Sequence, residues 1–381
     1  MEKKIRILFL DTRPIRRGAQ VFVQELKQQF SKDGHKVRRI FLYEEKNYEL
    51  LPLDEFDVVM PYTGNHFFEK IPTIHPLLVY KLGRAIKAFT PDVILCNGSR
   101  TLKYAAVVKR SFPGISSNWI YRVIDSAVYW NKRSLAQFYY RNFVIPAMDG
   151  AIGVSQKSLE EMIAHYGFKK PSVCIPRAID VDHFAQYIPN ENARENSGIN
   201  KNTFVLLFLG NFTTQKRPDR FVQIIHDLQN DIPNIHGLMV GDGPLRSAVQ
   251  EQVMQLDIQG KITLAGYQRD VRPWLAMSDV LLLTSDTEGM PGVVLEAAAM
   301  KVPSISGNVG GVSEFIQNGY NGLLVDWNLS NNNFKSILNF LCDTEELEKS
   351  SELSFTIVRN KYYINLIFNK YISFLNSIIK V

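Results

Sequence analysis

The chain has 381 residues, of which 45% are hydrophobic and 22% are charged. This length is too great for one ordinary hydrophobic core and suits two α/β domains of about 150–200 residues each. The composition excludes a disordered or low-complexity chain, and no apolar run reaches the roughly 18 residues that a membrane-spanning helix needs. Three widely spaced cysteines, Cys96, Cys174 and Cys342, fit neither a disulfide framework nor a zinc site, so the expected location is the reducing cytoplasm.

The net charge of +6 is divided unevenly along the chain. Residues 1–190 contain 28 Lys and Arg against 18 Asp and Glu, whereas residues 191–381 contain 16 against 20. A basic N-terminal half indicates an anionic partner, such as a membrane surface, a lipid phosphate or nucleic acid, unless the excess is only solvated surface. The basic clusters expected to face an anionic membrane are Arg13, Arg16 and Arg17, and Lys103, Lys109 and Arg110.

The first half of the chain alternates short apolar runs with amphipathic stretches. Apolar or β-branched runs suit strands that are buried on both faces of a parallel sheet. We predict strands near residues 5–10, 37–43, 57–60, 93–96, 119–124, 151–154 and 173–175, and helices near 19–33, 76–90, 100–111, 134–146 and 156–166. Right-handed β-α-β connections then give a doubly wound, Rossmann-like sheet, and we assign residues 1–187 to this N-terminal domain.

A polar stretch at residues 190–198 interrupts this pattern and is typical of a surface linker. The alternation then resumes, with predicted strands near residues 204–209, 237–240, 262–265, 280–283, 303–306 and 322–325, and helices near 218–229, 244–255, 270–277, 291–300 and 311–317. This second Rossmann-like domain, residues 188–345, is expected to face the first across a cleft, with ligands at the carboxyl ends of its strands. Residues 346–381 are predicted to form a helical tail that packs back on the N-terminal domain, unless its apolar stripe covers a membrane.

The strongest chemical signal lies in residues 287–297, which read TEGMPGVVLEA between a predicted strand and a predicted helix. Free backbone amides at a helix start attract phosphate, and glycines let a ligand approach closely. Glu288 and Glu296 are placed so that their carboxylates can accept hydrogen bonds from the hydroxyl groups of a sugar or a ribose. The alternative is that Glu288 only complements the helix dipole and that Glu296 is a solvated side chain.

This segment resembles the Glu-x7-Glu signature of the retaining glycosyltransferases of family 4, which have the GT-B fold and include transferases of bacterial surface polysaccharides. Further segments resemble the same family in the same order, and they are residues 17–21 (RGAQV), Gly210 with 216–218 (KRP), 240–245 (VGDGPL), 309–314 (VGGVSE) and 318–325 (NGYNGLLV). The resemblance spans residues 5–326. It departs at three positions, because Arg17, Ile124 and Asn211 stand where the family usually has a glycine, a histidine and an arginine.

The resemblance implies transfer with retention of configuration from a UDP- or GDP-sugar, with neither a cofactor nor a catalytic metal. The expected catalytic residues are Glu288, which positions the donor sugar, and Asp125, which substitutes for the missing histidine contact. The expected donor-binding residues are Gly18, Asn211, Lys216, Arg217, Gly266, Tyr267, Glu288, Gly289, Met290, Pro291, Gly292, Val293, Val294 and Glu296. The expected acceptor is a glycan or a lipid-linked sugar at the inner face of a membrane to which the protein attaches peripherally.

Other interpretations remain open. One is a sugar-nucleotide epimerase of the same fold, a second is a non-catalytic subunit that binds nucleotide sugars, and the last is a nucleic-acid-binding protein, for which no motif is present. The triplet 180–182 has the Asp-x-Asp form of magnesium-dependent transferases, but we favour a structural role at the domain junction. The aromatic stretch 62–70 is either an acceptor contact or a covered loop, and we favour the loop.

Overall fold

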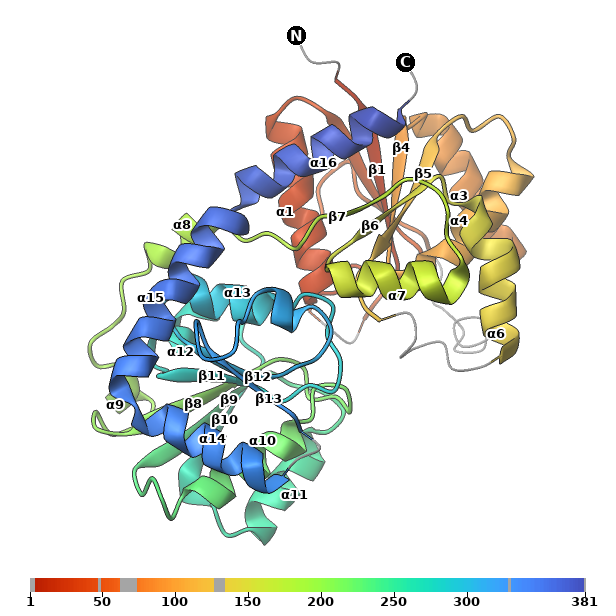
Figure 1. Ribbon diagram of the computed structural model, residues 1–381. Coiled ribbons are helices and arrows are strands. Elements are labelled where there is room, and N and C mark those ends of the chain that lie inside the picture. The colour runs from red at the N-terminus through yellow and green to blue at the C-terminus, as the bar shows by residue number, and fades with distance from the viewer. Residues whose placement is uncertain (1–3, 47–48, 62–73, 127–133, 328–329, 380–381) are drawn as a thin grey trace. The chain divides into compact units, whose positions relative to one another are not determined.

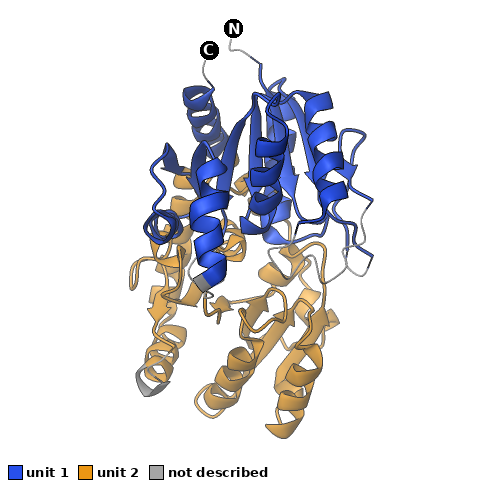
Figure 2. Cartoon of the chain, turned by 90° about the vertical axis from the view of Figure 1, so that its right-hand side faces the viewer, with its two compact units in different colours: residues 1–177, 365–381 blue, residues 178–364 orange. Residues whose placement is uncertain are grey.

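The computed structural model describes residues 4–46, 49–61, 74–126, 134–327 and 330–379 (Figure 1). The aromatic stretch 62–70 lies outside the described residues. The chain divides into two compact units, which Figure 2 shows in separate colours. Unit 1 comprises residues 1–177 and 365–381, and unit 2 comprises residues 178–364.

Unit 1 is built on a seven-stranded parallel sheet with the strand order β3-β2-β1-β4-β5-β6-β7. The strands are β1 (Arg6–Asp11), β2 (Lys36–Phe41), β3 (Val58–Val59), β4 (Val93–Asn97), β5 (Asn118–Val123), β6 (Gly150–Gly153) and β7 (Ser172–Cys174). The helices along them are α1 (Gly18–Lys32), α3 (Pro76–Phe89), α4 (Ser99–Ser111), α6 (Ser134–Tyr139) and α7 (Gln156–Tyr166). Every residue of β4 is buried, as expected for a central strand with helices on both faces of the sheet.

The last helix of the chain, α16 (Ile364–Ile378), packs on unit 1. Its buried residues recur at helical spacing and include Phe368 and Tyr371. The Phe368 ring lies 4.9 Å from that of Phe30 in α1, and Arg122 Nε of β5 donates a hydrogen bond of 3.1 Å to the Tyr371 hydroxyl. The apolar stripe that the sequence shows in the tail is therefore covered by the body of unit 1.

Unit 2 is built on a six-stranded parallel sheet with the strand order β10-β9-β8-β11-β12-β13. The strands are β8 (Phe204–Leu209), β9 (Ile235–Val240), β10 (Ile262–Gly266), β11 (Val280–Leu283), β12 (Ser304–Gly307) and β13 (Leu323–Val325). The helices are α8 (Val181–Ala185), α9 (Ala193–Asn196), α10 (Pro218–Leu228), α11 (Arg246–Gln255), α12 (Arg272–Ala276), α13 (Gly292–Ala299), α14 (Ser330–Cys342) and α15 (Thr344–Lys361). The predicted α/β fold with two doubly wound sheets is thus confirmed.

The limits of the two units differ from the expected domain limits of 187 and 345. The units divide after Arg177 and again after Ile364. The chain passes between the units at these two points, and the two passages lie side by side, since Ile179 forms a parallel bridge with Tyr363. Helices α8 and α15 both pack on α13, so residues on either side of the expected limits belong to the core of unit 2.

Two predicted helices are not regular α-helices along their whole length. Residues 134–146 form α6, then a π-helix at Tyr140–Val144 and a 3-10 helix at Ile145–Ala147. Pro146 explains the break, because proline has no amide hydrogen and clashes with the preceding turn of an α-helix. Residues 311–317 contain only a 3-10 helix, Val312–Glu314. No helix among the described residues combines the length and the hydropathy that crossing a membrane requires.

Candidate functional site

In unit 2 the strand order reverses between β8 and β11, and ligands of open α/β sheets bind at such a reversal. The loop after β8 carries Lys216, and the loop after β11 carries Glu288. Their side chains meet in an ion pair, with Lys216 Nζ 2.5 Å from Glu288 Oε1. Two of the residues that the sequence singled out, 72 positions apart, are therefore brought together at the carboxyl edge of the sheet.

Glu288 is held in a fixed position although its carboxylate is charged. Its side chain is only 7% exposed, and the Ser285 hydroxyl donates a second hydrogen bond, of 2.6 Å, to the same oxygen Oε1. The other oxygen, Oε2, accepts no hydrogen bond from the described residues. A buried carboxylate with one satisfied oxygen and one available oxygen is suited to accept a hydroxyl hydrogen from a ligand.

The loops that carry Lys216 and Glu288 are tied to each other by hydrogen bonds. The Thr284 hydroxyl donates to the carbonyl oxygens of Lys216 and Arg217, both at 2.9 Å. Gln215 Nε2 donates to the Thr287 carbonyl at 2.9 Å, and the Asp286 amide donates to the Gln215 carbonyl at 2.9 Å. Because these bonds involve the backbone on both sides, the separation of the Lys216 and Glu288 side chains is set by the fold.

Glycines allow the surrounding loops to approach the site. Gly310 has a φ of 54°, and a Cβ atom at this position would lie 1.6 Å from the carbonyl oxygen of Glu288. Gly241, at the end of β9, has a φ of 142°, and a Cβ there would lie 1.9 Å from the carbonyl oxygen of Gly210 at the end of β8. Neither position tolerates a side chain, since the backbone of the neighbouring loop already occupies the space.

Helix α13 starts four residues after Glu288, and no side chain caps the amides of its first turn. It begins at Gly292, with Pro291 as its N-cap residue and no side chain satisfying the first turn. The expected contacts Gly289, Met290, Pro291 and Gly292 are all buried in the approach to this helix. Val293 and Glu296 are half-buried and lie three residues apart, so they share the less covered face of the helix. Val294 points the other way and is buried in the core.

The predicted diphosphate contacts on the β8 loop have unequal environments. Asn211 is exposed and carries no charge. The Arg217 guanidinium is held by Asp219, at 2.7 Å, and by Asp286, at 3.4 Å. The hydrogen bond to Asp219 raises the pKa of Arg217. Burial favours the neutral form of Asp219, but the hydrogen bond and the charge of Arg217 outweigh it and hold the pKa of Asp219 below its ordinary value. Lys216 pairs with a single carboxylate, that of Glu288, on the loop that leads into α13, so it is the better placed cation for a phosphate group.

The expected contacts for the base lie at the end of β10. Gly266 has a φ of 70°, and its carbonyl oxygen accepts a hydrogen bond of 2.8 Å from the Gly241 amide. Tyr267 follows and is 40% exposed. The ends of β8, β9 and β10 therefore form one edge of unit 2, which continues to the Lys216–Glu288 pair.

The remaining two expected site residues belong to unit 1. Gly18 begins α1 and lies against the Arg177 guanidinium, because a Cβ atom at Gly18 would be 2.8 Å from Arg177 Nη1. Asp125 follows β5, and its Oδ1 accepts a hydrogen bond of 2.8 Å from the Ser126 amide. Arg177 next to a helix start is a candidate phosphate contact that sequence reasoning missed, since it lies 159 positions from Gly18 and outside the motif.

A buried polar cluster at the strand reversal of unit 1 was also missed. Asp11, at the end of β1, is 1% exposed and accepts hydrogen bonds from Gln20 Nε2 at 3.0 Å and Asn97 Nδ2 at 2.8 Å. Arg122 Nη1 donates to Asn97 Oδ1 at 2.7 Å. Burial raises the pKa of Asp11 to about 6, although these hydrogen bonds, that of the Thr12 amide and the charge of Arg122 all oppose the shift.

The Asp-x-Asp triplet has local structural partners. Asp180 Oδ1 accepts a hydrogen bond from the His183 amide and so caps α8, and Asp182 accepts one of 2.7 Å from the Tyr363 hydroxyl. Among the described residues, no group of three His, Cys, Asp or Glu side chains is arranged to hold a metal ion.

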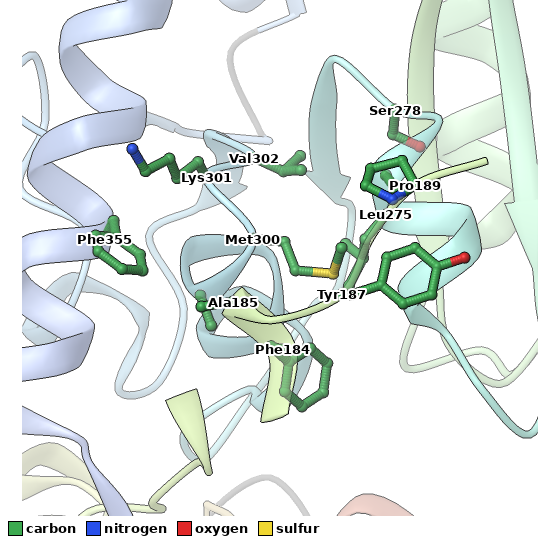
Figure 3. A pocket seen from close by; sticks show the side chains of 12 residues that line it. Phe184, Ala185, Tyr187, Pro189, Leu275, Ser278, Met300, Lys301, Val302 and Phe355 are labelled. Carbon is green, nitrogen blue, oxygen red and sulfur yellow. The ribbon is translucent and has the colours of Figure 1, made fainter. Parts of the chain in front are cut away.

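A separate cavity of about 330 Å³ lies in unit 2. Figure 3 shows the side chains that line it. Its lining includes Phe184, Tyr187, Met300 and Phe355, together with Val302, which directly precedes β12. The cavity therefore opens near the amino ends of the strands, at the edge opposite to the one where the Lys216–Glu288 pair lies.

Comparison with known proteins identifies the family. Residues 189–353 match the model of the group 1 glycosyl transferases, and residues 16–183 match that of glycosyltransferase family 4. The chain is a glycosyltransferase of the family 4 type. The first match lies within unit 2, and the second covers most of unit 1, including the predicted Gly18 and Asp125.

Curated relatives match this glycosyltransferase over parts of their length. One is UDP-Gal:alpha-D-GlcNAc-diphosphoundecaprenol alpha-1,3-galactosyltransferase of Escherichia coli, 30% identical over 40% of this chain and 41% of that protein. Another is N-acetyl-alpha-D-glucosaminyl L-malate synthase of Bacillus anthracis, 36% identical over 34% of each chain. These matches span less than half of either relative.

Solved structures match over almost the whole chain. HepE of Anabaena in complex with UDP superposes with a TM-score of 0.80 and 17% identity, covering 98% of this chain and 100% of that one. WaaG, a glycosyltransferase involved in lipopolysaccharide biosynthesis, superposes with a TM-score of 0.75 and 16% identity over 96% and 98% of the two chains. At this identity the likeness shows the fold, which is that of the GT-B glycosyltransferases.

Proposed function

We propose that this glycosyltransferase moves a sugar, with retention of anomeric configuration, from a UDP- or GDP-sugar to a glycan or lipid-linked acceptor in surface-polysaccharide biosynthesis. The observation that carries the proposal is the Lys216–Glu288 ion pair, 2.5 Å long, beside the free amides of α13. A nucleotide sugar presents a diphosphate next to a sugar ring, and this edge of unit 2 presents a cation and amides next to a carboxylate.

In this proposal each part of the donor has a partner in the site. Lys216 and the amides of Gly292 and Val293 would hold the diphosphate, where helix-start amides and fixed charge favour anions. Glu288 Oε2 would accept a hydroxyl hydrogen of the donor sugar, and Glu296 one of the ribose. The base would rest on the backbone near residues 266–267.

The chemical step requires stabilisation of the departing nucleoside diphosphate. As the bond from the sugar to the phosphate breaks, negative charge grows on the leaving group and positive charge grows on the sugar ring. Cations and amides that are already oriented stabilise that developing charge without reorganising. Lys216 would supply this charge directly, so the proposed reaction needs no metal ion, and no cofactor is part of the proposal.

The relatives support the choice of donor and acceptor class. The E. coli relative is named for a UDP-galactose donor and a diphosphoundecaprenol acceptor, and HepE was solved with UDP. Another relative, LpsE of Rhizobium meliloti, is named for lipopolysaccharide core biosynthesis and is 31% identical over 32% of this chain and 35% of its own. A lipid-linked acceptor would place the protein peripherally at the inner face of a membrane, with no role for nucleic acid.

The test is a screen of UDP- and GDP-sugars for thermal stabilisation of the whole chain, since a bound ligand raises the melting temperature by mass action. The stabilising donor is then assayed for transfer, and the anomer of the product is read by NMR. An inverted product, epimerised nucleotide sugar formed without acceptor, or binding with no turnover on any acceptor would each overturn the proposal. Complete inhibition by a chelator, reversed by magnesium, would overturn the metal-free mechanism.

A further inference from the structure

The basic clusters predicted to face a membrane are mostly engaged within unit 1. Lys103 is only 6% exposed. Lys109 Nζ donates to Asp149 at 2.6 Å, and Arg110 donates to the Phe143 carbonyl at 2.7 Å. In the other cluster, Arg13 forms an ion pair of 2.5 Å with Glu45. These side chains are therefore less available to lipid phosphates than exposed cations without a carboxylate partner.

One helix of unit 1 instead shows an exposed face that is both basic and apolar. Helix α3 buries Leu78, Val79, Leu82, Gly83, Ile86 and Phe89. Its opposite face carries three exposed cations, Lys81, Arg84 and Lys87. The same face carries Leu77 and Tyr80, each 52% exposed. Within the described part of the chain no carboxylate forms an ion pair with the three cations.

A second pair of exposed apolar side chains lies on α6, where Leu135 is 84% exposed and Phe138 is 69% exposed. Helix α4 packs against both α3 and the π-helix that continues α6, so these elements line one flank of the sheet. None of the helices α3, α4 and α6 contains an acidic residue. In each of α3 and α6 the apolar pair has the spacing i, i+3, which places both members on one helix face.

The apolar pairs lie toward the carboxyl edge of the unit 1 sheet. Helices α3 and α6 follow β3 and β5, so they start at the edge where those strands end (Figure 1). Leu77 and Tyr80 are in the first turns of α3, whereas Arg84 and Lys87 lie further along it. The carboxyl edge is also where open α/β sheets bind their ligands.

We infer that the exposed face of α3, together with Leu135 and Phe138 of α6, is the surface by which this chain docks on an anionic lipid bilayer. The inference rests on the proposed function, because a lipid-linked acceptor keeps its hydrocarbon tail in the bilayer while its sugar reaches the protein. Apolar side chains enter the interface and the cations contact lipid phosphates, as in interfacial amphipathic helices. A bilayer fits both features of the face, whereas nucleic acid would match only its charge.

The test is co-sedimentation of the full chain with vesicles of phosphatidylcholine alone or mixed with phosphatidylglycerol. We expect binding to the mixed vesicles only, weakened by salt. The triple variant Lys81→Glu/Arg84→Glu/Lys87→Glu should bind them roughly tenfold or more weakly, since each cation near an anionic surface contributes substantially. The matched control is Lys32→Glu/Lys36→Glu/Lys169→Glu, which makes the same charge change at exposed residues of other elements and should keep most of the binding.

A second variant separates the apolar contribution. Leu77→Ser/Tyr80→Ser changes two half-exposed side chains, so it should leave the melting temperature unchanged and reduce the binding that persists in high salt. The inference would be overturned if the wild type bound no vesicles or bound both vesicle types equally. It would also be overturned if the test and control triple variants lost the same amount of vesicle binding. Dissociation of a wild-type dimer by these variants would overturn it in favour of a self-association surface.

This experiment is independent of catalysis. Vesicle binding is measured without donor or acceptor, and calorimetry with UDP and GDP is run on the same variants. If nucleotide binding fails in every variant and in the wild type, the proposed function fails, whereas the docking surface is judged by the vesicle data alone.

Discussion

Lys216 Nζ and Glu288 Oε1 lie 2.5 Å apart across the strand reversal of unit 2, each neutralising the other. A donor diphosphate would compete with Glu288 for the ammonium group of Lys216, and Glu288 would then gain hydroxyl groups of the sugar in exchange. The two residues should therefore be coupled in catalysis, with the double variant less damaged than the sum of the single variants predicts.

Changing Glu288 and Glu296 should have different kinetic consequences. Glu288→Gln should lower kcat, because this carboxylate would orient the reacting sugar, whereas Glu296→Gln should mainly raise KM for the donor. Loss of a charged hydrogen bond costs roughly 1.5–3 kcal/mol, or about one to two decades in rate or affinity. Steady-state kinetics with the true donor give both constants, and Glu251→Gln on the exposed side of α11 is the control. Wild-type kinetics in both site variants would remove these residues from the mechanism.

Removing Lys216 should weaken nucleotide binding more than removing either neighbouring candidate. Lys216→Ala takes away a cation beside the amides of α13, whereas Asn211 is exposed and uncharged. Arg217→Ala should instead lower the melting temperature, since its guanidinium is engaged by Asp219 and Asp286. Calorimetry with UDP and GDP measures the affinities. A larger loss of affinity in Asn211→Ala than in Lys216→Ala would contradict the assignment.

The sequence predicted which candidate residues lie together where that depends on local chain geometry. Lys216 and Glu288 each follow an apolar strand, and parallel strands end at a common edge, so their meeting could be expected. The sequence could not show that Arg217 forms an ion pair with Asp286, because that contact depends on the exact course of two loops. Nor could it show that Arg122 of β5 reaches Tyr371 of α16, which lies 249 positions away.

The exposure of individual side chains was the feature that the sequence predicted least well. Lys103 and Lys81 look equivalent in the sequence, as lysines in amphipathic helices. The structure buries Lys103 on α4, where its ammonium lies 5.3 Å from the centre of the Tyr104 ring, and leaves Lys81 exposed on α3. The difference arises from which helix face meets the sheet, and a charge count along the chain does not contain that information.

Gly310→Ala should damage the site by steric overlap. The new Cβ would lie 1.6 Å from the carbonyl oxygen of Glu288, so the loop that carries Glu288 must move. The matched control is Gly319→Ala, which also has a positive φ, of 70°, but meets no atom within 4 Å. The control should therefore show only the backbone strain, about 1 kcal/mol. Melting temperature and kcat are measured for both, and equal effects would mean that the contact with Glu288 is unimportant.

The buried carboxyl of Asp11 should make unit 1 sensitive to pH. Burial raises its pKa from 3.8 to about 6 in the folded protein, against the hydrogen bonds of Asn97 and Gln20. Between these two values the folded state holds a proton that the unfolded state has released. Its contribution to stability is therefore complete below the lower value and is lost as the pH rises through the higher one.

Replacing this carboxyl with a group that does not titrate isolates the effect. The stability of the wild type relative to Asp11→Asn should fall between about pH 4 and pH 7, by at most about 3 kcal/mol for a shift of roughly two pKa units. The measurement is the difference in melting temperature between the two proteins at each pH. The exposed Asp231→Asn serves as the control and should keep a constant difference from the wild type. The melting-temperature difference between the wild type and Asp11→Asn could instead stay constant, or change in favour of the wild type as the pH rises. Either result would show that Asp11 is already ionised in the folded protein at low pH. The hydrogen bonds from Asn97, Gln20 and the Thr12 amide would then outweigh the cost of burying its charge.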